Sequence, residues 1–366
     1  MSPTRVGIIG CGKISAAYFK GSLAYPSLKI TACADLNIAL AQQLAAAHGL
    51  AFGGTVTGLL ARDDVDVVIN LTIPAAHTAL NRQALAAGKH VYCEKPFALT
   101  AAETIAVVED AERAGLRVAS APDTFLGAGI QTARYLIDTG AIGRPVAALG
   151  FMTSPGHESW HPNPAFYYQV GGGPMLDMGP YYVTALVNLL GPVARVSGVT
   201  QKSFATRTIT SEPRRGEVVN VEVPTHYSTS LEFTAGVTGT LVMSFDTIRY
   251  PLPNLVIYGS EGTLQVPDPN TFDGEVRLCR RGEKDFTVVP FTHALGRARG
   301  SGVADLAAAA RSGRPHRATG HLAHHVVEVL EAAARSAELG HHIPITSTCT
   351  RPAPVPTDLP ADRFDD

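Results

Sequence analysis

The chain has 366 residues, of which 45% are hydrophobic and 17% charged, and its formal net charge is −2. This composition allows a large buried core in about two domains and excludes a disordered chain, while the balanced charge argues against a nucleic-acid-binding surface. Apolar runs stay short of the ~20 residues that a membrane-spanning helix needs, and the first one is too short for a signal peptide. We expect a cytoplasmic protein that binds neither nucleic acid nor membrane.

The five cysteines form no Cys-x-x-Cys pair. A zinc site or a redox motif is therefore not indicated, and reduced core residues are the expectation. No group of side chains shows the spacing of metal ligands, so we expect no catalytic metal.

The first third of the chain alternates short apolar runs with helical patterns. Strands are expected at residues 5–9, 28–34, 65–72, 90–93 and 116–120. Helices are expected from residue 14, and at 39–47, 75–87 and 100–114. This alternation predicts an α/β fold, an N-terminal Rossmann domain with a doubly wound parallel sheet.

A glycine-rich turn directly follows the first expected strand. Gly10 allows a tight turn, Gly12 lets the backbone approach a pyrophosphate, and Lys13 and Ile14 lead into a helix whose N-terminus favours negative charge. Asp35 ends the second strand, where its carboxylate can accept hydrogen bonds from a ribose 2′-hydroxyl and repels a 2′-phosphate. We expect a dinucleotide site, with NAD favoured over NADP.

The alternation stops after Pro122. Helices are expected at residues 127–139, 179–190, 303–312 and 321–339, a strand at 145–152, and mostly strands from 195 to 289. This pattern predicts a C-terminal α+β domain with a large, mostly antiparallel open sheet. We expect a cofactor domain over 1–122, a substrate-binding and oligomerisation domain over 123–350, and a C-terminal arm over 351–366.

Three motifs carry a family resemblance that spans most of the chain. They are the turn at residues 10–15, the segment 87–96 that ends in Glu-Lys-Pro, and the segment 171–181, Gly-Gly-Gly-Pro-Met-Leu-Asp-Met-Gly-Pro-Tyr. With them the chain resembles the Gfo/Idh/MocA oxidoreductases, named after glucose–fructose oxidoreductase and inositol dehydrogenase. The resemblance implies hydride transfer between NAD(P) and a secondary alcohol of a sugar, sugar derivative or cyclitol, in a homodimer or homotetramer.

The resemblance also implies catalytic residues. The Glu-Lys-Pro lysine, here Lys95, lies beside the nicotinamide in the family, and the C-terminal end of a parallel strand is where such sheets bind ligands. The third motif usually reads Asp-x-Gly-x-His with histidine as acid/base; here the aspartate is Asp177 and Tyr181 stands at the histidine position. Tyr181 is expected to be the acid/base; alternatively it only positions substrate, while Lys95 or a histidine relays the proton.

Further residues are expected around the cofactor and the substrate. Thr72, Pro74, His77 and Glu94 would line the cofactor, although His77 also fits a core or helix-capping role. Asp123, Trp160 and His161 would contact substrate, the tryptophan by packing on a sugar ring; a loop anchor is the alternative for Trp160.

Two other functions stay open at this point. Some members of the family are cofactor-recycling lyases or glycosidases without net redox change, and others are non-catalytic dinucleotide-binding regulators.

Overall fold

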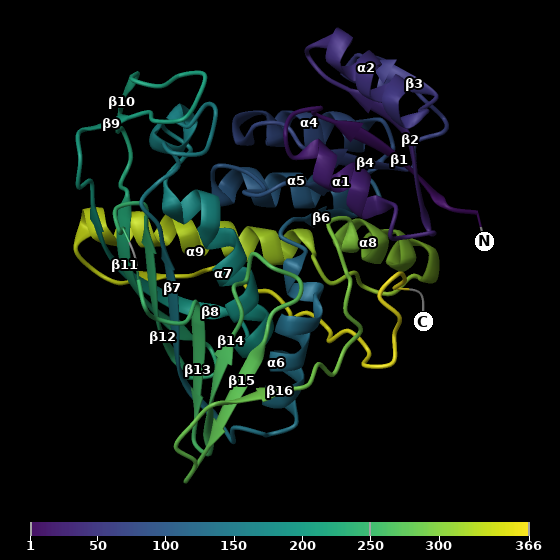
Figure 1. Cartoon of the computed structure of the whole chain (residues 1–366). Helices are drawn as coiled ribbons and strands as arrows, with labels where there is room; N and C mark the ends of the chain where they lie inside the picture. The colour runs from purple at the N-terminus through teal and green to yellow at the C-terminus, as the bar shows by residue number, and fades with distance from the viewer. Residues whose placement is uncertain (1, 249, 365–366) are drawn as a thin grey trace. The chain divides into compact units, whose positions relative to one another are not determined.

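The chain divides into two compact units. In this computed structural model, which describes residues 2–248 and 250–364, one unit comprises Met1–Gln131, Thr292–Val327 and Pro352–Asp366, and the other Thr132–Phe291 and Glu328–Arg351 (Figure 1). The first unit thus combines the predicted cofactor-binding range with two later segments. Within the described ranges, no helix has the length and apolarity needed to cross a membrane.

The first unit contains a six-stranded sheet in the order β3-β2-β1-β4-β5-β6. All neighbouring pairs are parallel. The strands are β1 (Thr4–Ile9), β2 (Leu28–Ala34), β3 (Phe52–Gly54), β4 (Val67–Asn70), β5 (His90–Cys93) and β6 (Val118–Ser120). The central strands are apolar and buried on both faces, as parallel strands require. The predicted Rossmann-type sheet is confirmed.

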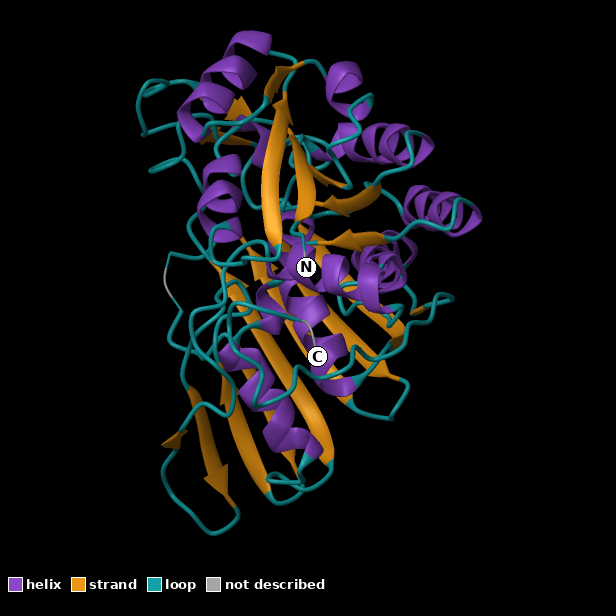
Figure 2. Ribbon diagram, turned by 90° about the vertical axis from the view of Figure 1, so that its right-hand side faces the viewer, coloured by secondary structure: helices purple, strands orange, loops and turns teal. Residues whose placement is uncertain are grey.

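Helices cover both faces of this sheet (Figure 2). They are α1 (Ser15–Ser22), α2 (Ile38–His48), α3 (Val56–Leu60), α4 (Pro74–Ala86), α5 (Ala101–Arg113) and α8 (Ser301–Ser312). Local chemistry fixes their ends: the Thr100 hydroxyl accepts the N–H of Glu103 at 3.2 Å to begin α5, and Gly49 ends α2 with φ 63°. The short elements β3 and α3 were not predicted, because a three-residue strand with two glycines carries no readable period.

The second unit is built on a nine-stranded sheet in the order β16-β15-β14-β13-β7-β12-β11-β8-β17. Only the pair β7–β12 is parallel. The strands are β7 (Pro145–Thr153), β8 (Val193–Gln201), β11 (His226–Phe233), β12 (Thr238–Ser244), β13 (Leu255–Gly259), β14 (Gly262–Val266), β15 (Val276–Arg280), β16 (Thr287–Val289) and β17 (Ile343–Pro344). A separate hairpin pairs β9 (Thr206–Thr208) with β10 (Val218–Asn220). The predicted large, mostly antiparallel sheet is confirmed.

Helix α7 (Pro174–Leu190) packs against β7, β11 and β12 in the middle of this sheet. The sequence predicted its start at residue 179, and that is wrong. Gly173, with φ 87°, precedes the helix, and Pro174 occupies its first turn, where the missing N–H costs nothing. Pro180 therefore lies inside the helix, and Asp177 in its first turn. Two further helices, α6 (Ala128–Asp138) and α9 (Gly320–Leu339), have residues in both units.

Candidate functional site

The glycine turn after β1 has the geometry that its sequence predicts. Gly10 has φ +100°, and a Cβ on it would lie 2.8 Å from the backbone of Leu71, so only glycine fits. A Cβ on Gly12 would meet nothing within 4 Å, which leaves the turn open on that side. Lys13 and Ile14 follow as exposed residues, and no side chain caps the start of α1 at Ile14.

Asp35 joins this turn from the end of β2. One carboxylate oxygen, Oδ2, accepts the backbone N–H of Cys11 at 2.7 Å, and Oδ1 accepts the N–H of Asn37 at 2.8 Å. These bonds hold the carboxylate beside the turn. Backbone N–H groups, an open glycine and a carboxylate at this place form the donor and acceptor set that suits a dinucleotide.

Glu94 and Lys95 lie at the C-terminal end of β5. The buried Glu94 carboxylate accepts the Tyr18 hydroxyl on Oε1 at 2.8 Å and the backbone N–H of Lys95 on Oε2 at 2.9 Å. Burial raises the pKa of Tyr18, which keeps that hydroxyl a donor. The Lys95–Pro96 peptide is cis, and the Lys95 side chain is half-buried. Glu94 thus supports the backbone that carries Lys95.

His77 is completely buried on α4. Its Nδ1 lies 2.8 Å from the carbonyl of Pro96, and its Nε2 lies 3.0 Å from the carbonyl of Thr72. The ring therefore joins the loop after β5 to the loop after β4. Burial lowers the pKa of His77. Pro74 begins the same helix, and the half-buried Thr72 donates its hydroxyl to Asn70.

Asp123 is also completely buried. Its Oδ2 accepts the N–H groups of Gly300 and Gly302, at 3.0 and 3.1 Å, and its Oδ1 lies 3.5 Å from Nη1 of Arg299. Burial raises the pKa of this carboxyl, an effect that the arginine and the two N–H groups oppose. Its contacts anchor the N-terminus of α8.

In the second unit, the loop between β7 and α7 gathers aromatic side chains. The His157 ring stacks on Tyr167, with centroids 3.7 Å apart and an interplanar angle of 11°, and meets Phe245 edge-on at 4.6 Å. Trp160 lies 5.4 Å from His157 and 5.3 Å from His161. Since Trp160 is 55% exposed, its ring is available to a ligand.

Asp177 brings a carboxylate to this aromatic group. Its Oδ2 lies 3.6 Å from Nε2 of His157. Tyr181, one turn further along α7, is largely buried. The structure thus brings Asp177 together with the predicted residues Trp160 and His161 through His157, which the sequence did not single out. No signal pointed to it, because the two partners lie 20 positions apart in the sequence and a largely irregular segment connects them.

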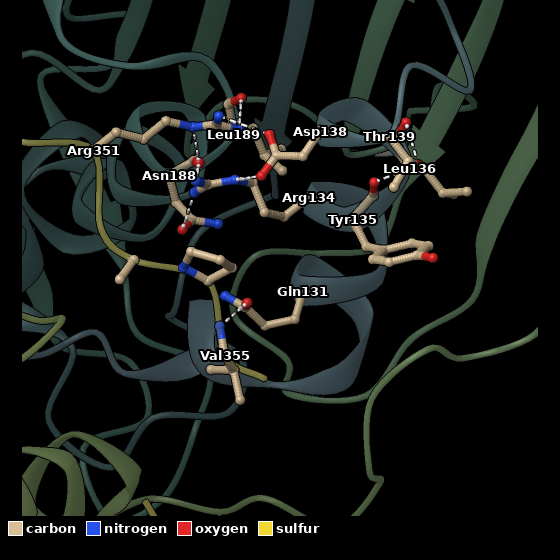
Figure 3. A network of polar contacts seen from close by, with 12 residues as sticks. Gln131, Arg134, Tyr135, Leu136, Asp138, Thr139, Asn188, Leu189, Arg351 and Val355 are labelled. Atoms are coloured by element: carbon tan, nitrogen blue, oxygen red, sulfur yellow. Dashed lines mark hydrogen bonds and ion pairs between the residues drawn. The ribbon is translucent and has the colours of Figure 1, made fainter. Parts of the chain in front are cut away.

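Two arginines fix the other end of α7 (Figure 3). Arg134 donates to the carbonyl of Asn188 at 2.6 Å, and Arg351 donates to the carbonyls of Asn188 and Leu189 at 2.8 and 2.6 Å. Both arginines also pair with Asp138 of α6. Cations at a helix C-terminus satisfy its free carbonyls and complement its dipole. The helix that carries Asp177 and Tyr181 is therefore held firmly.

Family models match most of the chain. The model described as "Oxidoreductase family, NAD-binding Rossmann fold" matches residues 4–121, and the one described as "GFO/IDH/MocA C-terminal domain" matches residues 130–265. The two matches follow the division of the fold into a parallel and a mostly antiparallel sheet.

Individual relatives are more distant. The dTDP-3,4-didehydro-2,6-dideoxy-alpha-D-glucose 3-reductase of Streptomyces violaceoruber is 31% identical over 56% of this chain and 59% of its own. D-xylose dehydrogenase of Paenarthrobacter nicotinovorans is 28% identical over 47% of this chain and 46% of its own. The chain thus spans about half the length of these relatives.

Solved structures share the complete fold. Levoglucosan dehydrogenase in complex with NADH and L-sorbose superimposes with a TM-score of 0.81 at 21% identity, over 95% of this chain and all of that one. The resemblance predicted from the motifs is confirmed. The chain belongs to the Gfo/Idh/MocA family of oxidoreductases.

Proposed function

We propose that this protein oxidises a secondary alcohol of a sugar, sugar derivative or cyclitol with NAD. The observation that carries the proposal is the placement of Lys95 at the carboxyl end of β5, with its backbone held by the buried Glu94. A cation at the carboxyl edge of a parallel sheet lies where such folds bind ligands. The named relatives, which reduce a deoxysugar and oxidise xylose, support a sugar substrate.

The first unit would hold the cofactor. The open side of Gly12 and the uncapped start of α1 suit a pyrophosphate, and Asp35 suits a ribose with a free 2′-hydroxyl. Lys13, Ile14, Thr72 and Pro74 complete the proposed cofactor-binding residues. Glu94 and His77 contribute by fixing the loops after β5 and β4. When bound, NAD supplies the hydride acceptor.

Three side chains would handle the substrate hydroxyl. Lys95 donates hydrogen bonds to the oxygen and stabilises the negative charge that develops on it. Asp177 orients the hydroxyl, and Tyr181 takes its proton. A phenol has an ordinary pKa of about 10, so this role requires a nearby positive charge that favours the phenolate.

Trp160 and His161 would form the sugar-binding surface. The exposed indole offers a flat apolar face to the C–H groups of a pyranose or cyclitol ring, while neighbouring polar groups bind its hydroxyls. An uncharged substrate also fits the balanced charge of the chain.

The proposed activity is tested with a panel of aldoses, anhydrosugars and inositols, each incubated with NAD and with NADP while absorbance at the reduced nicotinamide band is followed. We expect turnover of at least one polyol, and faster turnover with NAD. A protein that binds NAD and oxidises no member of the panel would contradict the proposal.

We further propose a homodimer or homotetramer in the cytoplasm. The sheet of the second unit carries a hollow of about 380 Å³ that is lined by strand residues of β7, β8, β11 and β12 and by His342. Light scattering coupled to size-exclusion chromatography would measure the mass, and a monomer at micromolar concentration would refute this assembly.

A further inference from the structure

The strongest feature outside the predicted site is the pair formed by His157 and Asp177. The two side chains are 9% and 17% exposed, and Nε2 of the imidazole lies 3.6 Å from Oδ2 of the carboxylate. Packing against Tyr167 and Phe245 alone does not require a carboxylate beside the imidazole, so the approach of Asp177 points to a further role. A carboxylate beside an imidazole fixes the orientation of both groups and favours the protonated ring.

The aromatic neighbours fix the direction of the imidazole. Tyr167 stacks on one face at 3.7 Å, and Phe245 meets the ring at an interplanar angle of 81°. With stacking on its face and an edge contact, the ring has little freedom to turn. Nε2 is therefore held toward α7.

The backbone of His157 is fixed as well. Its N–H donates to the hydroxyl of the buried Tyr168 at 3.3 Å, and its carbonyl accepts the N–H of His161 at 3.0 Å. Gly156 has φ +98°, and a Cβ there would lie 2.4 Å from that tyrosine hydroxyl. The loop thus accepts only glycine at this point, and it places the imidazole at one position.

The charges around His157 single out Asp177 as its partner. Glu158 lies 3.2 Å from Nη1 of Arg207, and the same guanidinium pairs with Asp246. This arginine compensates the charge of both carboxylates. The titratable or charged groups on the elements around the ring are Asp177 on α7, Glu158 and His161 on its own loop, Tyr167 and Tyr168 on η2 (Ala165–Tyr168), Arg207 on β9 and Asp246 after β12.

We propose that His157 is a positioning residue that acts through Asp177 in the oxidation of the substrate alcohol. The imidazole orients the carboxylate by engaging Oδ2, and its charge decides how strongly that carboxylate is drawn away from the substrate hydroxyl whose proton Tyr181 takes. This inference rests on the proposed function, and it adds an imidazole at a site where the motif on α7 offers only Tyr181.

The carbinol becomes a ketone: its carbon gives a hydride to NAD, and its oxygen gives a proton to the protein. Tyr181 accepts that proton, as in the proposed function. A neutral imidazole leaves the Asp177 carboxylate available to orient the substrate hydroxyl, whereas a protonated His157 pairs with the carboxylate and draws it away from the hydroxyl. Oxidation should therefore fail on the acid side of the imidazole titration.

The pairing itself is tested without any substrate. The ring resonances of His157 are followed by NMR against pH in the wild type and in Asp177→Asn. We expect the titration midpoint of His157 to fall by about one pH unit or more when the carboxylate charge is removed. An unchanged midpoint would overturn the proposal, even if the enzyme oxidised no sugar in any assay.

The positioning role of His157 is tested by steady-state kinetics on the substrate that the panel of sugars and inositols identifies. His157→Phe retains an aromatic ring for the stack and removes Nε2, so we expect kcat to fall by about ten- to a hundredfold, with KM within about threefold of the wild type. His157→Gln restores an N–H donor and should recover part of kcat. In both variants, the acid limb in the pH dependence of kcat/KM should no longer have its midpoint in the range where imidazoles titrate, near pH 6.5.

His226→Asn is the matched control. This histidine lies on β11, where its Nε2 contacts Ser228, and its removal should leave the pH profile and kcat unchanged. Three results would show that His157 is only a loop anchor: wild-type kcat in His157→Phe, a loss confined to KM, or an acid limb that persists in both His157 variants. Each would overturn the proposal.

Discussion

The Tyr18 hydroxyl donates a 2.8 Å hydrogen bond to Oε1 of Glu94, across a separation of 76 residues in the chain. The other carboxylate oxygen accepts the backbone N–H of Lys95. A tyrosine on α1 therefore supports the residue that precedes the proposed catalytic lysine. Neither side chain needs to touch the substrate to affect the reaction, because together they fix the position of the Lys95 backbone.

Tyr18→Phe should leave one oxygen of a buried carboxylate without its donor. We expect kcat to fall by about tenfold and the free energy of unfolding to drop by about 1–3 kcal/mol, with little change in NAD affinity. Steady-state kinetics and urea unfolding measure both effects. Tyr25→Phe is the control, because it removes a buried hydroxyl that contacts Ser301 and should destabilise the fold without lowering kcat. Equal kcat losses in the two variants would contradict the role of Tyr18.

Lys95→Ala should abolish turnover while NAD still binds. Removal of a donor that stabilises a developing oxyanion costs about 10²–10³ in kcat. Calorimetric titration with NAD measures the retained binding. Lys89→Ala offers a control lysine, whose ammonium instead donates to the carbonyl of Arg62. Normal turnover in Lys95→Ala would refute the site assignment.

Asp35→Asn should weaken the preference for NAD. Two like charges about 4 Å apart repel each other by about 1–4 kcal/mol near a protein surface, and this substitution removes that repulsion toward a 2′-phosphate. We expect the ratio of the NADP and NAD dissociation constants to fall by about tenfold. The exposed Asp63→Asn changes the net charge equally and should leave the ratio unchanged. A ratio that moved equally in both variants would exclude a specific contact.

Arg351→Ala should loosen the C-terminus of α7, because it removes the donors to the Asn188 and Leu189 carbonyls and the pair with Asp138 (Figure 3). We expect the free energy of unfolding to drop by about 1–3 kcal/mol. Arg195→Ala is the control, because it removes an exposed ion pair with Glu232. Its loss should lower the free energy of unfolding by only about 0–1 kcal/mol. Parallel denaturant titrations compare the two, and equal losses would argue against a specific clamp.

Glu328 should make the fold sensitive to acid. Burial alone would raise the pKa of its carboxyl, but hydrogen bonds from Ser347 and Thr346 lower it to about 2. Because the folded pKa lies below the unfolded value near 4.5, the stabilisation is complete above that pH and is lost as pH falls toward 2. Glu328→Gln should therefore be less stable than the wild type at pH 7, with a difference that shrinks between pH 4.5 and 2. A constant difference would contradict this linkage.

The family could be recognised from the sequence because its motifs are local. The glycine turn and Glu94-Lys95-Pro96 are contiguous, and each follows a strand whose apolar run is easy to recognise. The parallel sheet followed from the alternation of strands and helices. The start of α7 was missed because Gly173 and Pro174 resemble a loop, although proline is favoured in the first turn of a helix.

Several contacts that fix the candidate site were not predictable, since they join residues that lie far apart in the sequence. Asp123 was expected near the substrate, but its partners Gly300 and Gly302 come from a segment 177 and 179 residues later. The approach of His157 to Asp177 depends on an irregular loop without a period. Pattern reasoning detects regular elements and short motifs, whereas such pairs depend on the tertiary path of the chain.

The contact between Asp123 and α8 joins two segments that the ribosome synthesises at well-separated times. At about 5–20 residues per second, roughly 10–35 s pass between the synthesis of this aspartate and that of Gly300. Throughout that interval the nascent parallel sheet lacks α8, and the carboxylate lacks the amides that later surround it. Docking of α8 on the first unit must therefore follow synthesis of strands β7 to β16 of the second unit's sheet.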